Sequence, residues 1–219
     1  AVQSFTMLFL EMWAVNQMEP ADCQNYLTPK HVVPDPPHGY VIPYGDHPYD
    51  NENVGEEVYF HILNHSKKYV HIMTPYLILD SEMITTLTRA AKSGIEVIII
   101  MPHIPDKWYA FVLAHTYYKE LIQAGVSIYE YTPGFVHAKV FVADDDTATV
   151  GTINLDYRSL YLHFECGAYI YDHPVVVDIE RDFQETLKKC QKISLTEVEN
   201  RPVTHKVMGQ ILRLIAPLM

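Results

Sequence analysis

The sequence HAKVFVADDDTATVGTINLDYRSLYLHFE occupies residues 137–165 and predicts two strands joined by an acidic turn. The apolar run from Ala138 to Ala143 is typical of a strand, and the three aspartates that follow it favour a turn. Small and β-branched residues at 147–150 predict a second buried strand, which ends at Gly151. If the two strands pair as a hairpin, the end of the second returns beside the start of the first.

Four polar side chains gather at this end of the predicted hairpin. His137 and Lys139 are two residues apart, so an extended backbone directs both to one face, and Thr152 and Asn154 follow the second strand. A lysine with hydroxyl and carboxamide donors suits phosphoryl oxygens, and a histidine can act as a nucleophile or a general acid–base. These residues predict a phosphate site that needs no metal or cofactor. A surface hairpin with an incidental His and Lys fits the same spacing.

The spacing is similar to the HKD signature of the phospholipase D superfamily. Its fixed positions are His137, Lys139, Asp144, Gly151, Thr152 and Asn154. The run GTINLDYRSLYLHFE resembles the second HKD motif of bacterial cardiolipin synthases, where G-T-x-N-x-D-x-R-S and a later N-F-E recur. Two positions depart from that pattern, Ile153 in place of Ala and His163 in place of Asn, and they bear on fine specificity rather than on the reacting residues.

The resemblance implies a role for each residue of the motif. The implied catalytic residues are His137, Lys139, Asp144 and Glu165, and the implied phosphate-binding residues are Lys139, Thr152 and Asn154. Glu165 would orient the histidine by a hydrogen bond to its far ring nitrogen. Asp144, at the turn, is expected to stabilise the hairpin rather than to touch the substrate. His137 is either the nucleophile or the general acid–base, and the residues leave this open.

The resemblance further implies transfer of a phosphatidyl group between two phosphatidylglycerols through a phosphohistidine, with cardiolipin and glycerol as products. That reaction uses two HKD motifs, and this chain carries one. We therefore expect as partner either a separate first HKD half or a second copy of the chain. Two alternatives stay open at this point: a homodimeric single-motif phosphodiesterase or nuclease, and a non-catalytic domain that binds anionic lipid.

Composition limits the classes of partner and metal that the chain is expected to bind. The chain has 219 residues and a formal net charge of −11, which disfavours nucleic acid, because neutralising a phosphate backbone takes a basic surface. Cys23, Cys166 and Cys190 are odd in number and far apart, as in reduced thiols of a cytosolic protein, and nothing resembles a zinc site. His61 and His65 stand four residues apart without a third metal ligand in view.

Strands and helices alternate from residue 55 onward, which predicts an α/β domain with a sheet covered on both faces. The expected strands are 39–43, 69–73, 95–101, 126–131, 138–143, 147–150 and 165–171, and the expected helices are 56–65, 81–92, 108–124 and 174–190. Ser81 is the expected cap of the 81–92 helix. The resemblance implies the phospholipase D-like α/β/α sandwich with a mixed central sheet, over residues 39–192. The polar loop after the 39–43 strand either lines a pocket or only connects.

The two ends of the chain flank this domain. Residues 1–38 are expected to be a remnant helix of a preceding half plus a linker over Glu19–His38, and residues 193–219 a helical tail. The apolar run Val2–Trp13 is too short to span a bilayer and lacks the features of a signal peptide. The parent protein is expected at the cytoplasmic face of the cell membrane, and this chain to be soluble. The amphipathic stretch Val203–Met219 is either a packed tail or a membrane-surface segment.

Overall fold

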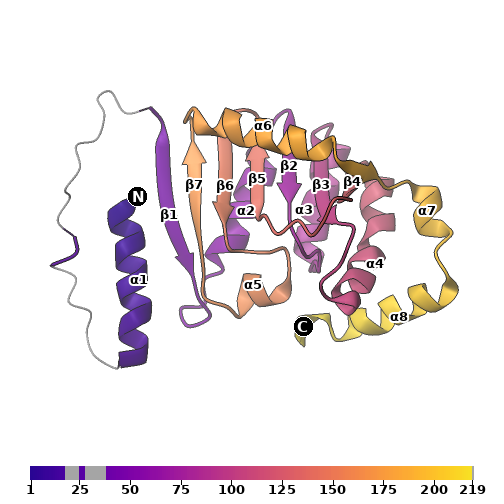
Figure 1. Ribbon diagram of the computed structural model, residues 1–219, viewed down its shortest axis with the longest axis horizontal. Helices are drawn as coiled ribbons and strands as arrows, with labels where there is room; N and C mark the ends of the chain where they lie inside the picture. The colour runs from indigo at the N-terminus through magenta and orange to yellow at the C-terminus, as the bar shows by residue number, and fades with distance from the viewer. Residues whose placement is uncertain (18–24, 28–37, 219) are drawn as a thin grey trace.

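A computed structural model describes residues 1–17, 25–27 and 38–218. Nearly all of the linker expected over Glu19–His38, and Cys23 within it, lie outside the described residues. The rest forms one mixed sheet with helices on both faces (Figure 1). This confirms the predicted α/β sandwich.

The sheet has eight strands in the order β1-β7-β6-β5-β2-β3-β4-β8. The strands are β1 Tyr40–Asp46, β2 Tyr69–Met73, β3 Glu96–Pro102, β4 Ser127–Tyr131, β5 Val140–Ala143, β6 Thr147–Gly151, β7 Glu165–Tyr171 and β8 Cys190–Lys192. Only the β2–β3 and β3–β4 pairs are parallel, and the other five are antiparallel. The predicted hairpin is confirmed as β5–β6, with Val140 opposite Val150.

Eight α-helices and a short terminal 3-10 helix are described. They are α1 Val2–Gln17, α2 Val54–His65, α3 Ser81–Lys92, α4 Trp108–Ala124, α5 Tyr157–Tyr161, α6 Val175–Leu187, α7 Leu195–Glu199, α8 Val203–Leu214 and η1 Ala216–Leu218. In Figure 1, α6 lies across one face of the sheet, and α2, α3 and α4 cover the other face. No helix in the described ranges is long and apolar enough to cross a bilayer.

Strand β3 shows why the sheet is covered on both faces. After Glu96 every residue of the run VIIIMP is buried. Ile98 and Ile100 pack in the cluster under α6, together with Phe183, whereas Val97 and Ile99 pack in the larger cluster under α2, α3 and α4. A strand buried on both faces has no polar side to alternate, which is the pattern that the sequence displayed.

Three local predictions were wrong. The cap of α3 is Asp80, whose carboxylate accepts a 2.7 Å hydrogen bond from the backbone nitrogen of Met83, and Ser81 is already the first helical residue. Helix α6 ends at Leu187 rather than Cys190, because Cys190–Lys192 pair with β4 and add β8 to the sheet. Strand β5 begins at Val140 rather than Ala138, so His137 and Lys139 precede it in a loop.

The C-terminal tail packs back onto the domain through α4. Gly209 of α8 sits where an added Cβ would approach the Thr116 side chain to 2.6 Å and the Val112 carbonyl to 3.2 Å. The absence of a Cβ therefore lets α8 lie close against α4. Helix η1 follows and contacts α5, which brings the C-terminus to the end of the sheet where α5 lies (Figure 1).

Candidate active site

One end of the sheet, where the parallel strands finish, holds the motif residues other than Asp144. Met73, the last residue of β2, pairs with Val140, so Lys139 lies directly beyond the carboxyl end of β2. Thr152 follows the end of β6, and Glu165 begins β7 at the same edge. In open α/β sheets, ligands bind outside the carboxyl ends of parallel strands. The topology therefore supplies a site at this edge, beside α5 (Figure 1).

Lys139 is the buried cation of the site. Its residue is 9% exposed, and its Nζ donates a 2.8 Å hydrogen bond to the carbonyl oxygen of His137. Burial lowers the pKa of Lys139 below its ordinary value, while the carboxylates of Glu165 and Asp156 act in the opposite direction. An ammonium held in a partly desolvated place interacts more strongly with an anionic ligand than a surface lysine does.

His137 is exposed and stacks on Phe135, with ring centroids 5.6 Å apart. Burial and the neighbouring Lys139 lower the pKa of the His137 imidazole, against an opposing effect of Asp106. A neutral imidazole at neutral pH can attack phosphorus or accept a proton. Both histidine roles left open by the sequence therefore stay compatible with the structure.

Thr152 and Glu165 form the central polar pair. The hydroxyl of Thr152 donates to Oε2 of Glu165, and the backbone nitrogen of Thr152 donates to the Cys166 carbonyl at 2.9 Å. Nδ1 of His163 lies 3.6 Å from the other oxygen of Glu165. Among the described residues Glu165 makes no hydrogen bond to His137, so the predicted orienting bond is absent from this structure. The Glu165 carboxylate contacts Thr152 and His163 instead.

Asn154 is held by the start of α5. Its Nδ2 donates a 2.8 Å hydrogen bond to Oγ of Ser159, and Asp156 caps the helix by accepting from the Ser159 backbone nitrogen at 2.8 Å. Oδ1 of Asn154 is buried without a partner in the described part of the chain. Since the Ser159 hydroxyl can also donate, a flipped amide satisfies Ser159 equally well and leaves two amide N–H donors for a ligand.

Gly151 explains how closely β6 and β7 approach one another at this edge. A Cβ on Gly151 would lie 2.4 Å from the Cys166 carbonyl oxygen, and one on Gly167, its pairing partner, would lie 2.4 Å from the Tyr44 ring. No side chain fits at either position without displacing backbone or a packed ring. The two glycines thus allow Thr152 to reach the Glu165 carboxylate.

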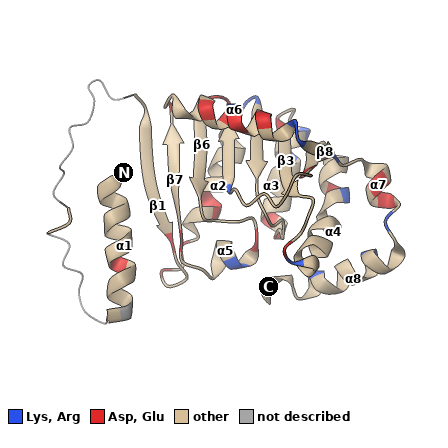
Figure 2. Ribbon diagram, viewed as in Figure 1, with Lys and Arg blue, Asp and Glu red and all other residues tan. Residues whose placement is uncertain are grey.

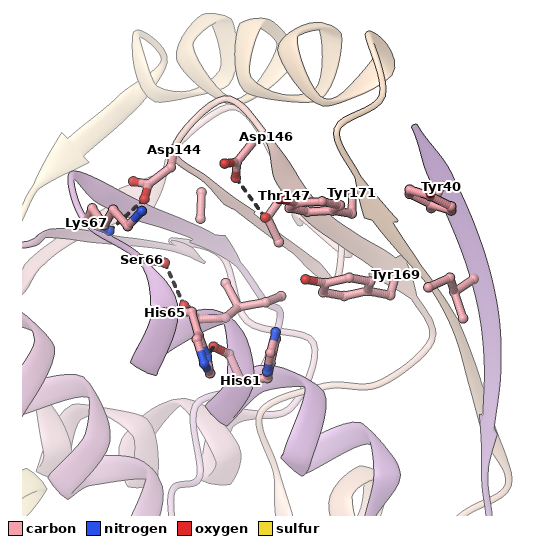
Figure 3. A pocket seen from close by; sticks show the side chains of 13 residues that line it. Tyr40, His61, His65, Ser66, Lys67, Asp144, Asp146, Thr147, Tyr169 and Tyr171 are labelled. Atoms are coloured by element: carbon pink, nitrogen blue, oxygen red, sulfur yellow. Dashed lines mark hydrogen bonds between the residues drawn. The ribbon is translucent and has the colours of Figure 1, made fainter. Parts of the chain in front are cut away.

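Asp144 lies at the other end of β5 from His137 and Lys139. Its carboxylate accepts hydrogen bonds from the backbone nitrogens of Lys67, Lys68 and Tyr69 at 2.6, 2.9 and 2.9 Å. Figure 3 shows Asp144 with Lys67 beside the hairpin turn. The length of β5 separates Asp144 from His137 and Lys139, which favours the expected hairpin-stabilising role over the catalytic one. Asp144 ties the hairpin turn to the start of β2.

A cavity of about 450 Å³ also lies at this far end, between α2 and the β1–β7–β6 part of the sheet (Figure 3). His61 and His65 line it, with ring centroids 4.1 Å apart. Within residues 1–17, 25–27 and 38–218, no group of three or more His, Cys, Asp or Glu side chains is arranged to hold a metal ion. This cavity receives none of the residues of the candidate active site.

The structure places further residues beside the site, some outside the motif and one, Arg158, within its G-T-x-N-x-D-x-R-S run. The hydroxyl of Tyr76 donates a 2.5 Å hydrogen bond to Asp106, and Lys107 lies 5.1 Å from the centre of the Tyr76 ring. Arg158 Nε donates to His163 Nε2 at 3.1 Å. A cavity of about 270 Å³ lies among Tyr76, Lys107, Arg158 and other residues beside the motif. One signal was available in the sequence: residues 103–107 follow a parallel strand at its carboxyl end.

The polar loop after β1 lies at the same edge. Phe164, which precedes Glu165, contacts Tyr49 edge-on at 5.5 Å between centroids and contacts His47 at 5.9 Å. The loop therefore covers the residue next to the central carboxylate. The sequence left open whether this loop lines a pocket or only connects two elements, and the structure favours a loop beside the site.

Comparison with known proteins identifies the family. Residues 59–187, more than half of the chain, match the sequence family described as "Cardiolipin synthase, PLD-like domain". The chain belongs to the phospholipase D superfamily. It is 33% identical over 219 residues to a cardiolipin synthase of Geobacillus kaustophilus and 52% identical over 219 residues to an uncharacterized protein of Streptococcus mutans. It spans 43% and 47% of the lengths of these two relatives, respectively.

Solved structures of the superfamily share the fold. The phospholipase D family member Nuc from Salmonella typhimurium aligns over 69% of this chain and 99% of its own, with a TM-score of 0.57 and 18% identity. The phosphatidylserine synthase of Haemophilus influenzae aligns over 82% of this chain and 48% of its own, with a TM-score of 0.66 and 18% identity. The predicted phospholipase D-like fold is thereby confirmed.

Proposed function

We propose that this chain is one half of a phosphatidyltransferase that joins two phosphatidylglycerols into cardiolipin and releases glycerol. The observation that carries the proposal is the meeting of His137, buried Lys139 and the Thr152–Glu165 pair at one edge of the sheet. The cardiolipin synthase relative supports the choice of substrate, since it matches the whole of this chain.

The phosphate is held by donors from three parts of the loop region. Lys139 supplies a positive charge and Asn154 a neutral donor to the non-bridging oxygens, and the Thr152 hydroxyl becomes a third donor when its single proton turns from Glu165 to the phosphate. Charge that builds on those oxygens in the transition state is stabilised by donors already in position, which is typically the largest catalytic term. The Lys139 ammonium already donates to the His137 carbonyl, so it keeps two further N–H donors for the phosphate.

Two histidines share the transfer. A nitrogen of the first attacks phosphorus, the N–P bond forms, and the P–O bond to the leaving glycerol breaks, while the second histidine gives that oxygen its proton. The second histidine then takes a proton from the hydroxyl of another phosphatidylglycerol, whose oxygen attacks phosphorus and breaks the N–P bond. His137 supplies one of these two rings. The other comes from a separate HKD half or from a second copy of this chain.

A phosphodiester substrate tests both assemblies. We would measure turnover of bis(p-nitrophenyl) phosphate across protein concentration, and cardiolipin and glycerol formed from phosphatidylglycerol vesicles, for the chain and for His137→Ala. His38→Ala is the matched control, since His38 is an exposed histidine that precedes the opposite end of β1. We expect cardiolipin and glycerol in equal amounts when both histidines are present, and loss of both products in His137→Ala only.

The alternative, a homodimeric phosphodiesterase, gives a different result. Its specific activity rises with protein concentration, and mixing wild type with His137→Ala lowers activity as expected for sites built from two chains. Its product from phosphatidylglycerol is phosphatidic acid without cardiolipin. That product pattern, in place of cardiolipin, would rule out the transferase and leave the phosphodiesterase.

A further inference from the structure

A second polar cavity lies away from the motif residues, where the C-terminal helices pack on the domain. It has a volume of about 200 Å³ and lies between α4, α7 and α8. Three basic side chains line it, Lys119, Arg201 and Lys206, against one carboxylate, Glu199. The chain as a whole carries a net charge of −11, so a cavity with an excess of cations departs from its surroundings.

The two lysines are positioned at the rim by the end of α7. Nζ of Lys119 lies 3.0 Å from Oε1 of Glu199, and Nζ of Lys206 donates to the backbone carbonyl of the same residue at 2.6 Å. An ammonium has three N–H donors, so each lysine keeps two for a ligand. Glu199 thus fixes both cations while neutralising only one charge.

Arg201 has hydrogen-bonding capacity that the protein leaves unused. Its guanidinium lies over the Tyr118 ring at 5.2 Å, and its Nη2 is 3.8 Å from the buried carboxylate of Glu130, longer than a hydrogen bond. Its Nη1 is buried and has no acceptor among the described residues. A buried donor without a partner is uncommon in proteins and indicates that a ligand or water completes it.

Two histidines add neutral groups to the same cavity. Nδ1 of His115 lies 3.4 Å from Nε2 of His205. Burial lowers the pKa of His115 to about 4, and burial together with Arg201 lowers the pKa of His205. Both imidazoles are therefore uncharged near neutral pH, and the positive charge of the cavity comes from Lys119, Arg201 and Lys206.

The outward side of α8 is apolar next to this cavity. Val203, Val207, Ile211 and Leu214 are spaced three and four residues apart, so they form one stripe, and they are 73%, 54%, 53% and 83% exposed. Lys206, which lines the cavity, lies next to this apolar stripe on the surface of α8. Helix α8 lies at the same end of the sheet as α5 (Figure 1), whereas the acidic residues of α6 lie at the other end (Figure 2).

We propose that the cavity between α4, α7 and α8 binds the phosphate of an anionic phospholipid while the apolar stripe of α8 lies in the membrane surface. Phosphate needs several converging donors, and Lys119, Lys206 and Arg201 supply them. An amphipathic helix with basic residues beside its apolar face is the arrangement that lies in the interface of an anionic membrane. Docking on α8 brings the edge that holds His137 toward the lipid. The proposal does not depend on catalysis, since it concerns binding only.

Vesicle co-sedimentation of the full chain tests the proposal. We compare phosphatidylcholine vesicles with and without phosphatidylglycerol, using the chain and Lys119→Gln/Lys206→Gln. We expect the double variant to bind anionic vesicles about 10- to 30-fold more weakly, because each of the two lysines contributes a similar factor to the affinity for an anionic surface. Lys92→Gln/Lys189→Gln removes the same charge at two exposed positions, the end of α3 and the turn between α6 and β8, and should change binding by less than about threefold. Equal binding by wild type and the Lys119/Lys206 double variant overturns the proposal.

Further variants test the apolar stripe of α8 and the cationic cavity separately. Val207→Ser/Ile211→Ser should reduce binding to both kinds of vesicle, and Glu199→Gln should strengthen binding to the anionic ones. Turnover of soluble bis(p-nitrophenyl) phosphate is measured beside vesicle binding, so a failed function and a failed docking surface give different results. Inorganic phosphate, titrated against the His205 ring signals by NMR, reports the cavity alone. If phosphate binds there and vesicles do not, the membrane source is overturned and the ligand is a soluble phosphate ester.

Discussion

The hydroxyl of Tyr59 in α2 donates a 2.6 Å hydrogen bond to the backbone carbonyl of Ile153, between two residues of the candidate site. Tyr59 is 2% exposed, and its ring stacks on Phe141 of β5 with centroids 4.1 Å apart. The core thus holds the loop that carries Thr152 and Asn154. Tyr59 thereby helps to position Thr152 and Asn154, the two proposed phosphate-binding residues on either side of Ile153.

Tyr59→Phe should therefore affect both stability and turnover. The change keeps the stacked ring but leaves the Ile153 carbonyl unpaired, which costs about 1–3 kcal/mol of unfolding free energy. We expect kcat for a chromogenic diester to fall at least about tenfold, because small misplacement of binding groups is costly. Tyr117→Phe is the matched control, since that buried residue of α4 has no hydroxyl partner among the described residues. Unchanged kcat in a folded Tyr59→Phe chain would show that the loop holds its position without this bond.

Lys139→Met should separate catalysis from stability. The methionine fills the same space without a buried charge, and burial already lowers the pKa of Lys139, which means that the folded state disfavours its charged form. We expect diester turnover to fall about 100- to 1,000-fold, as on removal of a transition-state donor, and the urea midpoint to stay equal or rise. A chain that loses stability along with activity would assign Lys139 a structural role.

Asp144→Asn should weaken the fold and spare the chemistry. The backbone of Asp144 has a φ of 54°, a conformation that Asn tolerates, so this variant removes charge without adding strain. Although burial acts to raise it, hydrogen bonds from the nitrogens of Tyr69, Lys67 and Lys68 lower the pKa of Asp144. Its stabilisation is then present above the unfolded value near pH 4 and is lost as pH falls further. Urea unfolding at pH 7 should show a loss of about 1–2 kcal/mol with kcat per folded molecule unchanged.

Much of the fold could be predicted from the sequence because its elements carry strong local signals. Helix α4 begins and ends where the sequence predicts, since Gly125 adopts a φ of 106° that stops it. Strand β7 likewise matches at both ends. The misses are short. Strand β8 has three residues and is defined by pairing with β4, and α5 and α7 have five residues each, so none of them shows a periodic pattern.

Some residues of the candidate site could likewise be predicted from the sequence, and others could not. His137, Lys139, Thr152 and Glu165 could be grouped from spacing and resemblance, because hairpin pairing brings sequence neighbours together. Tyr76, Asp106 and Lys107 come from the loops after β2 and β3, and only the order of strands in the sheet places them near His137. The bond of Glu165 to Thr152 rather than His137 depends on side-chain placement within the site, which spacing does not specify.

A pH dependence of stability is expected from the contact of three elements around Tyr161. Its hydroxyl oxygen lies 2.7 Å from Oε1 of Glu56 in α2 and 2.6 Å from Oδ2 of Asp80 at the start of α3, and its single proton is donated to one carboxylate at a time. Burial raises the pKa of Glu56 to about 7, and the nearby Asp80 carboxylate adds to the effect, against the Tyr161 hydrogen bond. The folded-state pKa lies above the unfolded one, so the stabilisation is complete below about pH 4.5 and is lost as pH rises through 7.

Glu56→Gln should remove this dependence. The amide keeps an oxygen that can accept from Tyr161 and carries no charge at any of these pH values, so we expect the variant to gain about 1–2 kcal/mol over wild type at pH 8 and little at pH 5. Urea unfolding of both chains at these two pH values measures the difference. Glu57→Gln, the neighbouring exposed residue of α2, is the matched control and should give equal differences at both. A parallel pH response of wild type and Glu56→Gln would mean that Glu56 is ionised in the folded chain at neutral pH, with the Tyr161 hydroxyl between two charged carboxylates.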